Sequence, residues 1–216
     1  DEPWEVLENQ FLDDENTNNE DIITEEVIES EIETEEIAEE IKSGKLEIDT
    51  SAEDIHSFVE GVLTDRLGAV GKKVHTGRSR NDQIALDERL YLKNAIVDLK
   101  KEIVTLIDTL TDIAKNHTET LISGYTHMQR AQPVTLAHHL CSWAWMIKRD
   151  FERLSDANKR IDFSPLGSGA LAGSGLPLNR EMVAEELGFA GVTKNSLDSV
   201  ADRDYCVELC SCFSIL

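Results

Sequence analysis

The sequence predicts an all-α fold, a bundle of very long helices, and three observations support this prediction. One long stretch repeats apolar residues at alternating spacings of four and three, and a second stretch further along the chain does the same. No alternating run rich in Val, Ile and Thr marks a strand. We therefore expect long helices packed lengthwise and no sheet.

The first long helix is predicted from about Gln83 to Lys115. At 1.5 Å per residue it would be about 50 Å long, far longer than the average globular helix. Its apolar seam consists of Leu92, Ile96, Leu99, Ile103, Leu106, Leu110 and Ile113.

A second long helix is predicted from Leu136 onward. The intervening heptad positions of its seam hold Asp150 and Ala157. A polar group on a seam indicates a pairing or register constraint, and solvent access is the alternative. The apolar positions are Leu136, Leu140, Trp143, Ile147, Leu154 and Ile161.

The segment between these helices, residues 123–133, is predicted to be a polar turn. It reads SGYTHMQRAQP. Pro133 suits the first position of the following helix, where a missing N–H costs no hydrogen bond.

The N-terminal part is expected to be simpler. Residues 1–35 are rich in Asp, Glu and Asn and predict a flexible acidic arm, with a short helix over Thr24–Lys42 as the alternative. Residues 50–54, TSAED, are expected to form an N-cap with its capping-box partner and to open a further helix that runs to about Leu67. We divide the remainder into a small N-terminal helical domain, residues 36–80, and the first part of a long-helix bundle, residues 81–216.

The net charge of −22 is distributed unevenly. Residues 1–60 hold 23 of the 43 acidic side chains and only two basic ones, Lys42 and Lys45, so the rest of the chain is nearly neutral. A nucleic-acid partner is not expected, because the phosphate backbone would repel this molecule and no stripe of Lys and Arg is present.

No apolar stretch reaches the 18 to 20 residues or so that span a bilayer, and no signal-peptide pattern opens the chain. We therefore expect no membrane contact and a cytoplasmic location. The four cysteines, Cys141, Cys206, Cys210 and Cys212, lack the paired spacing of a zinc site, so we expect reduced thiols and no metal.

Residues 75–83 carry the chemistry that stands out most. They read HTGRSRNDQ, with no apolar side chain. Arg78 and Arg80 can form bidentate hydrogen bonds to carboxylates or phosphates, while Ser79, Asn81 and Gln83 supply further donors. The segment predicts a loop that binds a small anion.

Four segments resemble the argininosuccinate lyase family of the fumarase and aspartase superfamily, which includes the delta crystallins. Two are the loop at residues 75–83 and the turn at 124–133. The others are residues 36–60, with EDIH, and residues 164–173, which read SPLGSGALAG, while NSLDSVADRD at 195–204 extends the match. The resemblance covers residues 36–210 in one register and implies the long-helix bundle of that superfamily, incomplete here.

The resemblance implies the reversible cleavage of argininosuccinate into arginine and fumarate, as in arginine biosynthesis and the urea cycle, without metal or cofactor. By position, His127 is the acid/base residue and Asn81 and Thr126 bind substrate. Ser79 and Arg80 contact a substrate carboxylate. Supporting positions are His56, Arg78 and Gln129.

The family's catalytic serine loop, on a Gly-Ser-Ser-x-Met-Pro segment, has no counterpart before Leu216. Because the family builds each site from three subunits of a homotetramer, we expect a truncated chain, inactive alone, that forms homotetramers or mixes with full-length subunits. The alternative is a non-catalytic, crystallin-like or regulatory subunit. Adenylosuccinate or fumarate as substrate is disfavoured by the loop at 77–83.

Residues 167–172, GSGALA, also have the outline of a dinucleotide fingerprint. The segment follows a predicted helix and Pro165 rather than a strand, so the context that the motif requires is missing. We expect a connection that permits close packing and no nucleotide cofactor.

Overall fold

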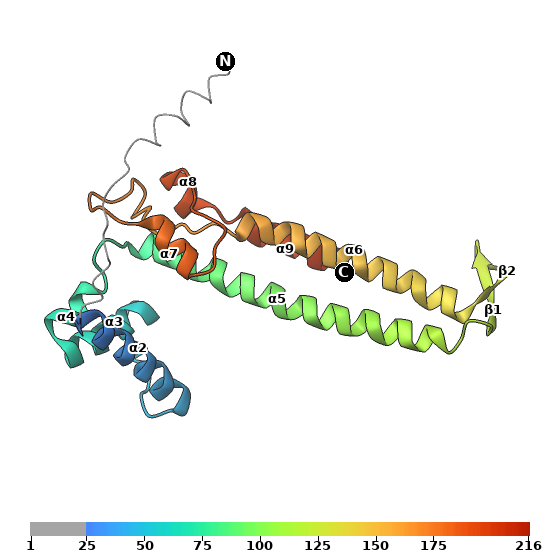
Figure 1. Cartoon of the computed structure of the whole chain (residues 1–216), viewed down its shortest axis with the longest axis horizontal. Coiled ribbons are helices and arrows are strands. Elements are labelled where there is room, and N and C mark those ends of the chain that lie inside the picture. The colour runs from blue at the N-terminus through green and yellow to red at the C-terminus, as the bar shows by residue number, and fades with distance from the viewer. Residues whose placement is uncertain (1–24) are drawn as a thin grey trace, which may run out of the picture. The chain divides into compact units, whose positions relative to one another are not determined.

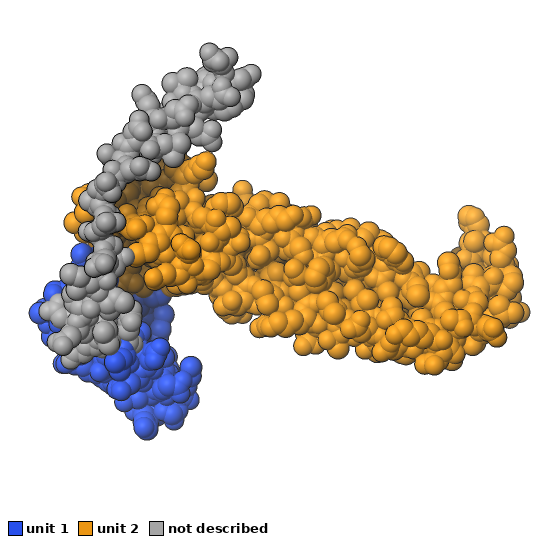
Figure 2. Space-filling model, viewed as in Figure 1, with its two compact units in different colours: residues 1–76 blue, residues 77–216 orange. Residues whose placement is uncertain are grey.

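The computed structural model describes residues 25–216, with side chains from residue 32 onward. These residues fall into two compact units, which divide between Thr76 and Gly77 (Figure 2). The first contains α2 (Glu25–Ser43), α3 (Ile55–Leu67) and α4 (Ala69–Lys73). The second contains α5 (Arg80–Lys115), β1 (Leu121–Thr126), β2 (Gln129–Thr135), α6 (Leu136–Ile161), α7 (Arg180–Glu186), α8 (Ser196–Ala201) and α9 (Asp204–Ile215).

In the first unit, α2 adopts the helical alternative predicted for this region and ends before Gly44, whose φ of +72° suits a helix stop. Residues 1–24 of the predicted acidic arm lie outside the described part of the chain. Arg66 of α3 pairs with Glu33 and Glu40 of α2, at 2.5 and 2.6 Å. These ion pairs hold the two helices together at their rim.

The cap of α3 is the last residue of the predicted cap segment, residues 50–54. The helix begins at Ile55, and its cap is Asp54, whose carboxylate accepts a hydrogen bond from the Ser57 N–H at 2.7 Å. Ser51, at the start of that segment, lies in a separate turn, where its N–H donates to the Asp49 side chain at 2.8 Å.

In the second unit, α5 and α6 lie side by side along most of their length, and α9 packs against α6 (Figure 1). The predicted long-helix fold is confirmed. The main core of this unit comes from these three helices and consists of Ile96, Ile103, Leu154, Ala157, Ile161, Tyr205, Leu209 and Cys212. A smaller core at the start of α5 consists of Leu86, Ala184 and Phe189.

The predicted seam of α5 holds only in its first half. Ile96 and Ile103 are buried, whereas Leu106 is 48% exposed and Ile113 is also exposed. Toward the end of α5 the buried or half-buried positions shift by one residue, to Ile107 and Ala114. An ideal helix drifts about 20° per heptad from a strict seven-residue repeat, which accounts for the shift.

The seam of α6 shows a similar change. Trp143, predicted to be on the seam, is exposed, and the neighbouring Ala144 is buried instead. Asp150 is buried as its heptad position predicts, and its carboxylate accepts a hydrogen bond from Arg153 Nη1 at 2.5 Å. The polar group on the seam is therefore satisfied within its own helix rather than by solvent.

The prediction that no sheet forms is wrong for the segment between α5 and α6. β1 and β2 pair antiparallel from Leu121↔Thr135 to Thr126↔Gln129. Most of their side chains are exposed on both faces, so the apolar/polar alternation of a half-buried strand is missing from the sequence. Pro133 lies in β2, and α6 is capped instead by Thr135, which accepts from the His138 N–H at 3.1 Å.

Candidate functional site

The polar loop before α5 is organised by the helix cap. Ser79 is the N-cap residue, and its hydroxyl accepts a hydrogen bond from the Asn81 N–H at 3.3 Å. Asp82, three residues later, accepts from the Ser79 N–H at 2.8 Å and completes a capping box. This arrangement starts the helix at Arg80, three residues earlier than the seam predicts, and fixes Ser79 and Asn81 in its first turn.

The same Asp82 carboxylate joins the loop to the glycine-rich connection after α6. Its Oδ2 atom accepts hydrogen bonds from the N–H groups of Gly167 and Gly169, at 3.0 and 2.8 Å. Asp82 is 0% exposed. The loop and the connection, 85 residues apart in sequence, are therefore held in contact at a buried carboxyl group.

The predicted substrate-binding side chains lie around this contact. The Asn81 side-chain NH₂ donates to the Ala170 carbonyl at 3.1 Å, which directs the amide oxygen away from the connection. Arg80 Nη1 donates to Gln83 Oε1 at 2.6 Å, and Arg78 is half-buried directly before the cap. The loop thus gathers two guanidinium groups, a hydroxyl and an amide at the start of one helix, an arrangement suited to a carboxylate ligand.

The predicted acid/base residue lies at the tip of the hairpin. His127 and Met128 form its two-residue turn, with φ of +51° and +59°. Thr126 and Gln129 flank the turn as the last residue of β1 and the first of β2, and all four side chains are exposed. An imidazole, a hydroxyl and an amide are therefore presented together on one protruding turn.

The loop and the hairpin tip lie at opposite ends of α5 (Figure 1). A helix of 36 residues is about 54 Å long at 1.5 Å per residue. Asn81 and His127 of one chain are therefore too far apart to touch the same small molecule. His56, half-buried in the first turn of α3, belongs to the other compact unit.

The GSGALA segment, residues 167–172, does not have the strand-to-helix context of a dinucleotide fingerprint. Gly167 and Gly169 lie in turns rather than between a strand and a helix, and their N–H groups bind the Asp82 carboxylate. The amides that a pyrophosphate would need are thus occupied by the protein itself. In residues 25–216, no group of three or more His, Cys, Asp or Glu side chains is arranged to hold a metal ion, and no helix is apolar and long enough to cross a bilayer.

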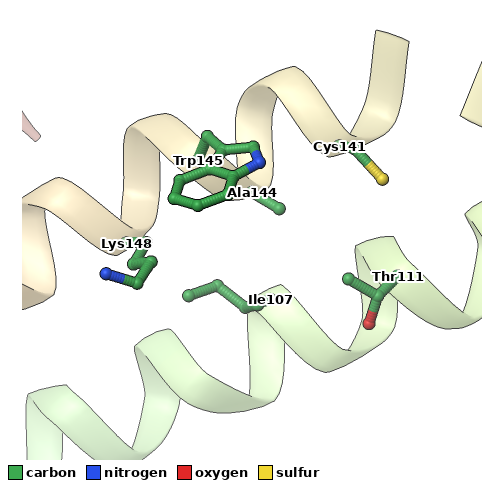
Figure 3. A pocket seen from close by; sticks show the side chains of 6 residues that line it. All are labelled: Ile107, Thr111, Cys141, Ala144, Trp145 and Lys148. Carbon is green, nitrogen blue, oxygen red and sulfur yellow. The ribbon is translucent and has the colours of Figure 1, made fainter. Parts of the chain in front are cut away.

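A hollow of about 210 Å³ lies between α5 and α6 (Figure 3). Its walls are largely apolar, and none of the predicted site residues lines it. A small dianion would find only one cation there, so we do not assign this hollow to substrate. The lining residues are Ile107, Thr111, Cys141, Ala144, Trp145 and Lys148.

A family model described as "Lyase" matches residues 12–216, which is nearly the whole chain. The chain belongs to this lyase family. The argininosuccinate lyase of Acetivibrio thermocellus is 56% identical to this lyase-family chain over 181 residues, and that of Clostridium beijerinckii is 58% identical over 181 residues. The resemblance to argininosuccinate lyases predicted from the motifs is confirmed.

The alignments cover 84% of this lyase-family chain, which spans about 40% of the length of those relatives. A crystal structure of EDDS lyase in complex with formate matches 88% of the chain and 36% of its own, with a TM-score of 0.76 and 28% identity. A second EDDS lyase structure, a variant with bound fumarate, matches equally well.

The sequence predictions for this lyase-family chain omit the residues that hold its loop in place. They do not include Asp82, which caps α5 within the loop, or Gly167, Gly169 and Ala170, which hydrogen-bond to the loop. The Ser-x-x-Asp spacing of a capping box was available as a signal for Asp82. The contacts with the connection had no such signal, because they join residues far apart in sequence.

Proposed function

We propose that this chain provides part of an argininosuccinate lyase, which cleaves argininosuccinate reversibly into arginine and fumarate. The observation that supports this proposal best is the 53–58% identity to argininosuccinate lyases over a region that includes both polar segments. The proposal places the protein in arginine biosynthesis and in the cytoplasm.

The reaction is an elimination with defined requirements. A base removes a proton from the carbon beside a carboxylate of the succinate part, the C–N bond breaks, and its electrons leave with the guanidinium nitrogen, which takes up a proton. His127 suits proton transfer because an imidazole can both accept and donate a proton, and Thr126 beside it can orient a substrate oxygen. No step in this scheme calls for a metal or a cofactor.

The loop before α5 suits the charged ends of the substrate. Ser79 and Arg80 would bind a substrate carboxylate by charge-assisted hydrogen bonds, with Arg78 adding positive charge. Asn81 would contribute its amide oxygen, because its NH₂ group already donates to Ala170. Gln129 and His56 keep supporting roles in this proposal.

The proposed site requires more than one chain. Because the α5 helix separates Asn81 from His127, the loop of one copy would meet the hairpin tip of another, in a homotetramer or in an assembly with full-length subunits. Each site would then combine segments that no single chain brings together.

The test is a mixing experiment. The chain is refolded with full-length argininosuccinate lyase of Clostridium beijerinckii in which the residue equivalent to His127 is replaced by Asn, and arginine and fumarate are assayed. Restored turnover is expected with the wild-type chain. The matched His127→Asn chain should restore a turnover that is at least about 10²-fold lower, because proton transfer by His127 is lost.

Two results would contradict the proposal. Equal turnover with the wild-type and His127→Asn chains would remove His127 from the catalytic residues. Absence of turnover with a wild-type chain that demonstrably co-assembles would favour the non-catalytic, structural alternative.

A further inference from the structure

Asp82 is an acidic side chain that the proposed chemistry does not use, yet it is 0% exposed. Its partners are three backbone N–H groups, those of Ser79 on Oδ1 and of Gly167 and Gly169 on Oδ2. Burying a carboxylate is costly unless its oxygens are hydrogen-bonded, and charge-assisted bonds from N–H groups are strong. This carboxylate is therefore a fixed anchor between two segments.

The connection is shaped to receive this carboxylate. Gly167 and Gly169 have φ of +86° and +61°, a left-handed backbone that L side chains rarely adopt. A Cβ atom on Gly167 would lie 2.7 Å from the Arg180 side chain, and one on Gly169 would lie 2.6 Å from the Gly173 carbonyl oxygen. Two N–H groups converging on one oxygen form an anion-binding nest, and an internal carboxylate fills it.

The anchor lies next to residues that the proposed function uses. Ser79 donates its N–H to Asp82, and Asn81, directly before Asp82, donates its side-chain NH₂ to Ala170 in the same connection. Loosening the connection would therefore release the Asn81 amide and weaken the cap that orients Ser79.

We infer that Asp82 is a positioning residue: it does not touch substrate but holds Ser79 and Asn81 in their binding orientation by anchoring residues 167–170 against the loop. The inference rests on the proposed function for the role of the loop. The anchoring itself is a property of this chain alone.

The test uses the full 216-residue chain as wild type, as Asp82→Asn and as Ser199→Ala. Asn has the shape of Asp but places an NH₂ group where N–H donors converge. Ser199 is a matched control: it is equally buried, its hydroxyl accepts a hydrogen bond from Ser168 at 2.8 Å in the same connection, and its other hydrogen bonds go to Thr193 and Pro165 rather than to the loop. Any change caused by Ser199→Ala therefore reports a structural defect of the connection alone.

The first measurement is amide hydrogen exchange at Ser79, Gly167 and Gly169 in each chain. Asp82→Asn should accelerate exchange at all three amides by at least 10-fold, and Ser199→Ala should leave Ser79 unchanged. Unchanged exchange at Gly167 and Gly169 in Asp82→Asn would overturn the inference. If Asp82→Asn is unfolded by circular dichroism, Asp82→Glu replaces it, since it keeps the charge but displaces the carboxylate by one methylene.

The second measurement is the KM for argininosuccinate in mixtures with full-length Clostridium beijerinckii enzyme inactivated at the residue equivalent to Asn81. Asp82→Asn should raise KM at least 10-fold. Ser199→Ala should lower only the amount of restored turnover, because KM does not depend on how many sites assemble. An unchanged KM for Asp82→Asn would overturn the inference. If a wild-type chain that demonstrably co-assembles restores nothing, the proposed function fails instead, and hydrogen exchange alone decides whether Asp82 is the anchor.

Discussion

The guanidinium of Arg89 in α5 pairs with the carboxylate of Asp202 after α8, at 2.7 Å, with only 3% of the Arg89 side chain exposed. The neighbouring residues form a second ion pair in which the charges are exchanged between the two segments: Arg203 pairs with Glu88 at 2.6 Å. Arg89 also lies over the Tyr205 ring, 4.5 Å from its centre. Two interlocked ion pairs therefore tie α5 to the segment that joins α8 and α9.

Replacing Arg89 with Met should lower the free energy of unfolding by about 3 kcal/mol, because it leaves a partly buried carboxylate without its partner. The measurement is urea unfolding followed by tryptophan fluorescence, to which Trp143 and Trp145 of the same unit contribute. Lys101→Met, which removes an exposed ion pair with Asp98, is the control and should cost less than about 1 kcal/mol. Equal losses would show that the Arg89 pair adds nothing beyond a surface contact.

Tyr205 should make stability fall at high pH. Burial and a hydrogen bond to Glu88 raise the pKa of Tyr205 above its ordinary value of about 10. Above that value the unfolded chain ionises while the folded chain stays protonated, so this contribution to stability is complete below pH 10 and is lost as the pH rises toward the folded pKa.

The urea midpoint from pH 8 to pH 11 should therefore fall less steeply for Tyr205→Phe than for wild type. Tyr91, whose side chain is exposed, provides the matched control, and Tyr91→Phe should follow the wild-type curve. Parallel curves for all three proteins would show that Tyr205 ionises equally easily in both states.

Ile103 and Leu106 lie on the same predicted seam, but replacing each with Ala should lower the free energy of unfolding by different amounts. Ile103, 4% exposed, should lose about 2–4 kcal/mol of stability on replacement by Ala, because its removal leaves a cavity in the core. Leu106→Ala should cost less than about 1 kcal/mol, since this side chain is half exposed already. Urea unfolding measures both, and a similar cost at Leu106 would mean that its face is covered in solution.

Met128→Gly should stabilise the hairpin. The left-handed conformation of a non-glycine residue costs about 1–2 kcal/mol, which exceeds the extra chain entropy of Gly, and Met128, 94% exposed, loses almost no contact. Slower hydrogen exchange of the Tyr125 and Arg130 amides would report the gain. Met128→Val should speed up exchange of the same amides, because a β-branched residue tolerates positive φ poorly. Identical exchange rates in wild type, Met128→Gly and Met128→Val would show that the turn is unstrained.

The two long helices could be predicted because their apolar residues repeat locally, whatever the rest of the fold. Which face is buried at the far end of α5 could not, since Ile107 rather than Leu106 is favoured only after helical drift has accumulated over several turns. The hairpin could not be predicted either, because the sequence has no pattern that indicates its strands or its turn. Its strands are exposed on both faces, and His127-Met128 replaces the Asn-Gly pair that marks such turns.

The candidate site shows the same limit. Ser79, Arg80 and Asn81 could be chosen from sequence because their donors cluster within three positions. The Asp82 contacts to Gly167 and Gly169 could not, because they depend on how the chain returns to the start of α5 after two helices and a hairpin. The separation of Asn81 from His127 follows directly from the predicted helix length.

The length of the uninterrupted α5 helix also sets the distance and the angle between the loop at its start and the hairpin tip beyond its end. Each residue added to or removed from its middle would shift everything beyond it by 1.5 Å and rotate it by about 100°, so the hairpin tip would point in a new direction relative to the loop. The central turns of α5 hold none of the candidate site residues. Their sequence can therefore vary widely at exposed positions, whereas their number of residues cannot change without misplacing His127.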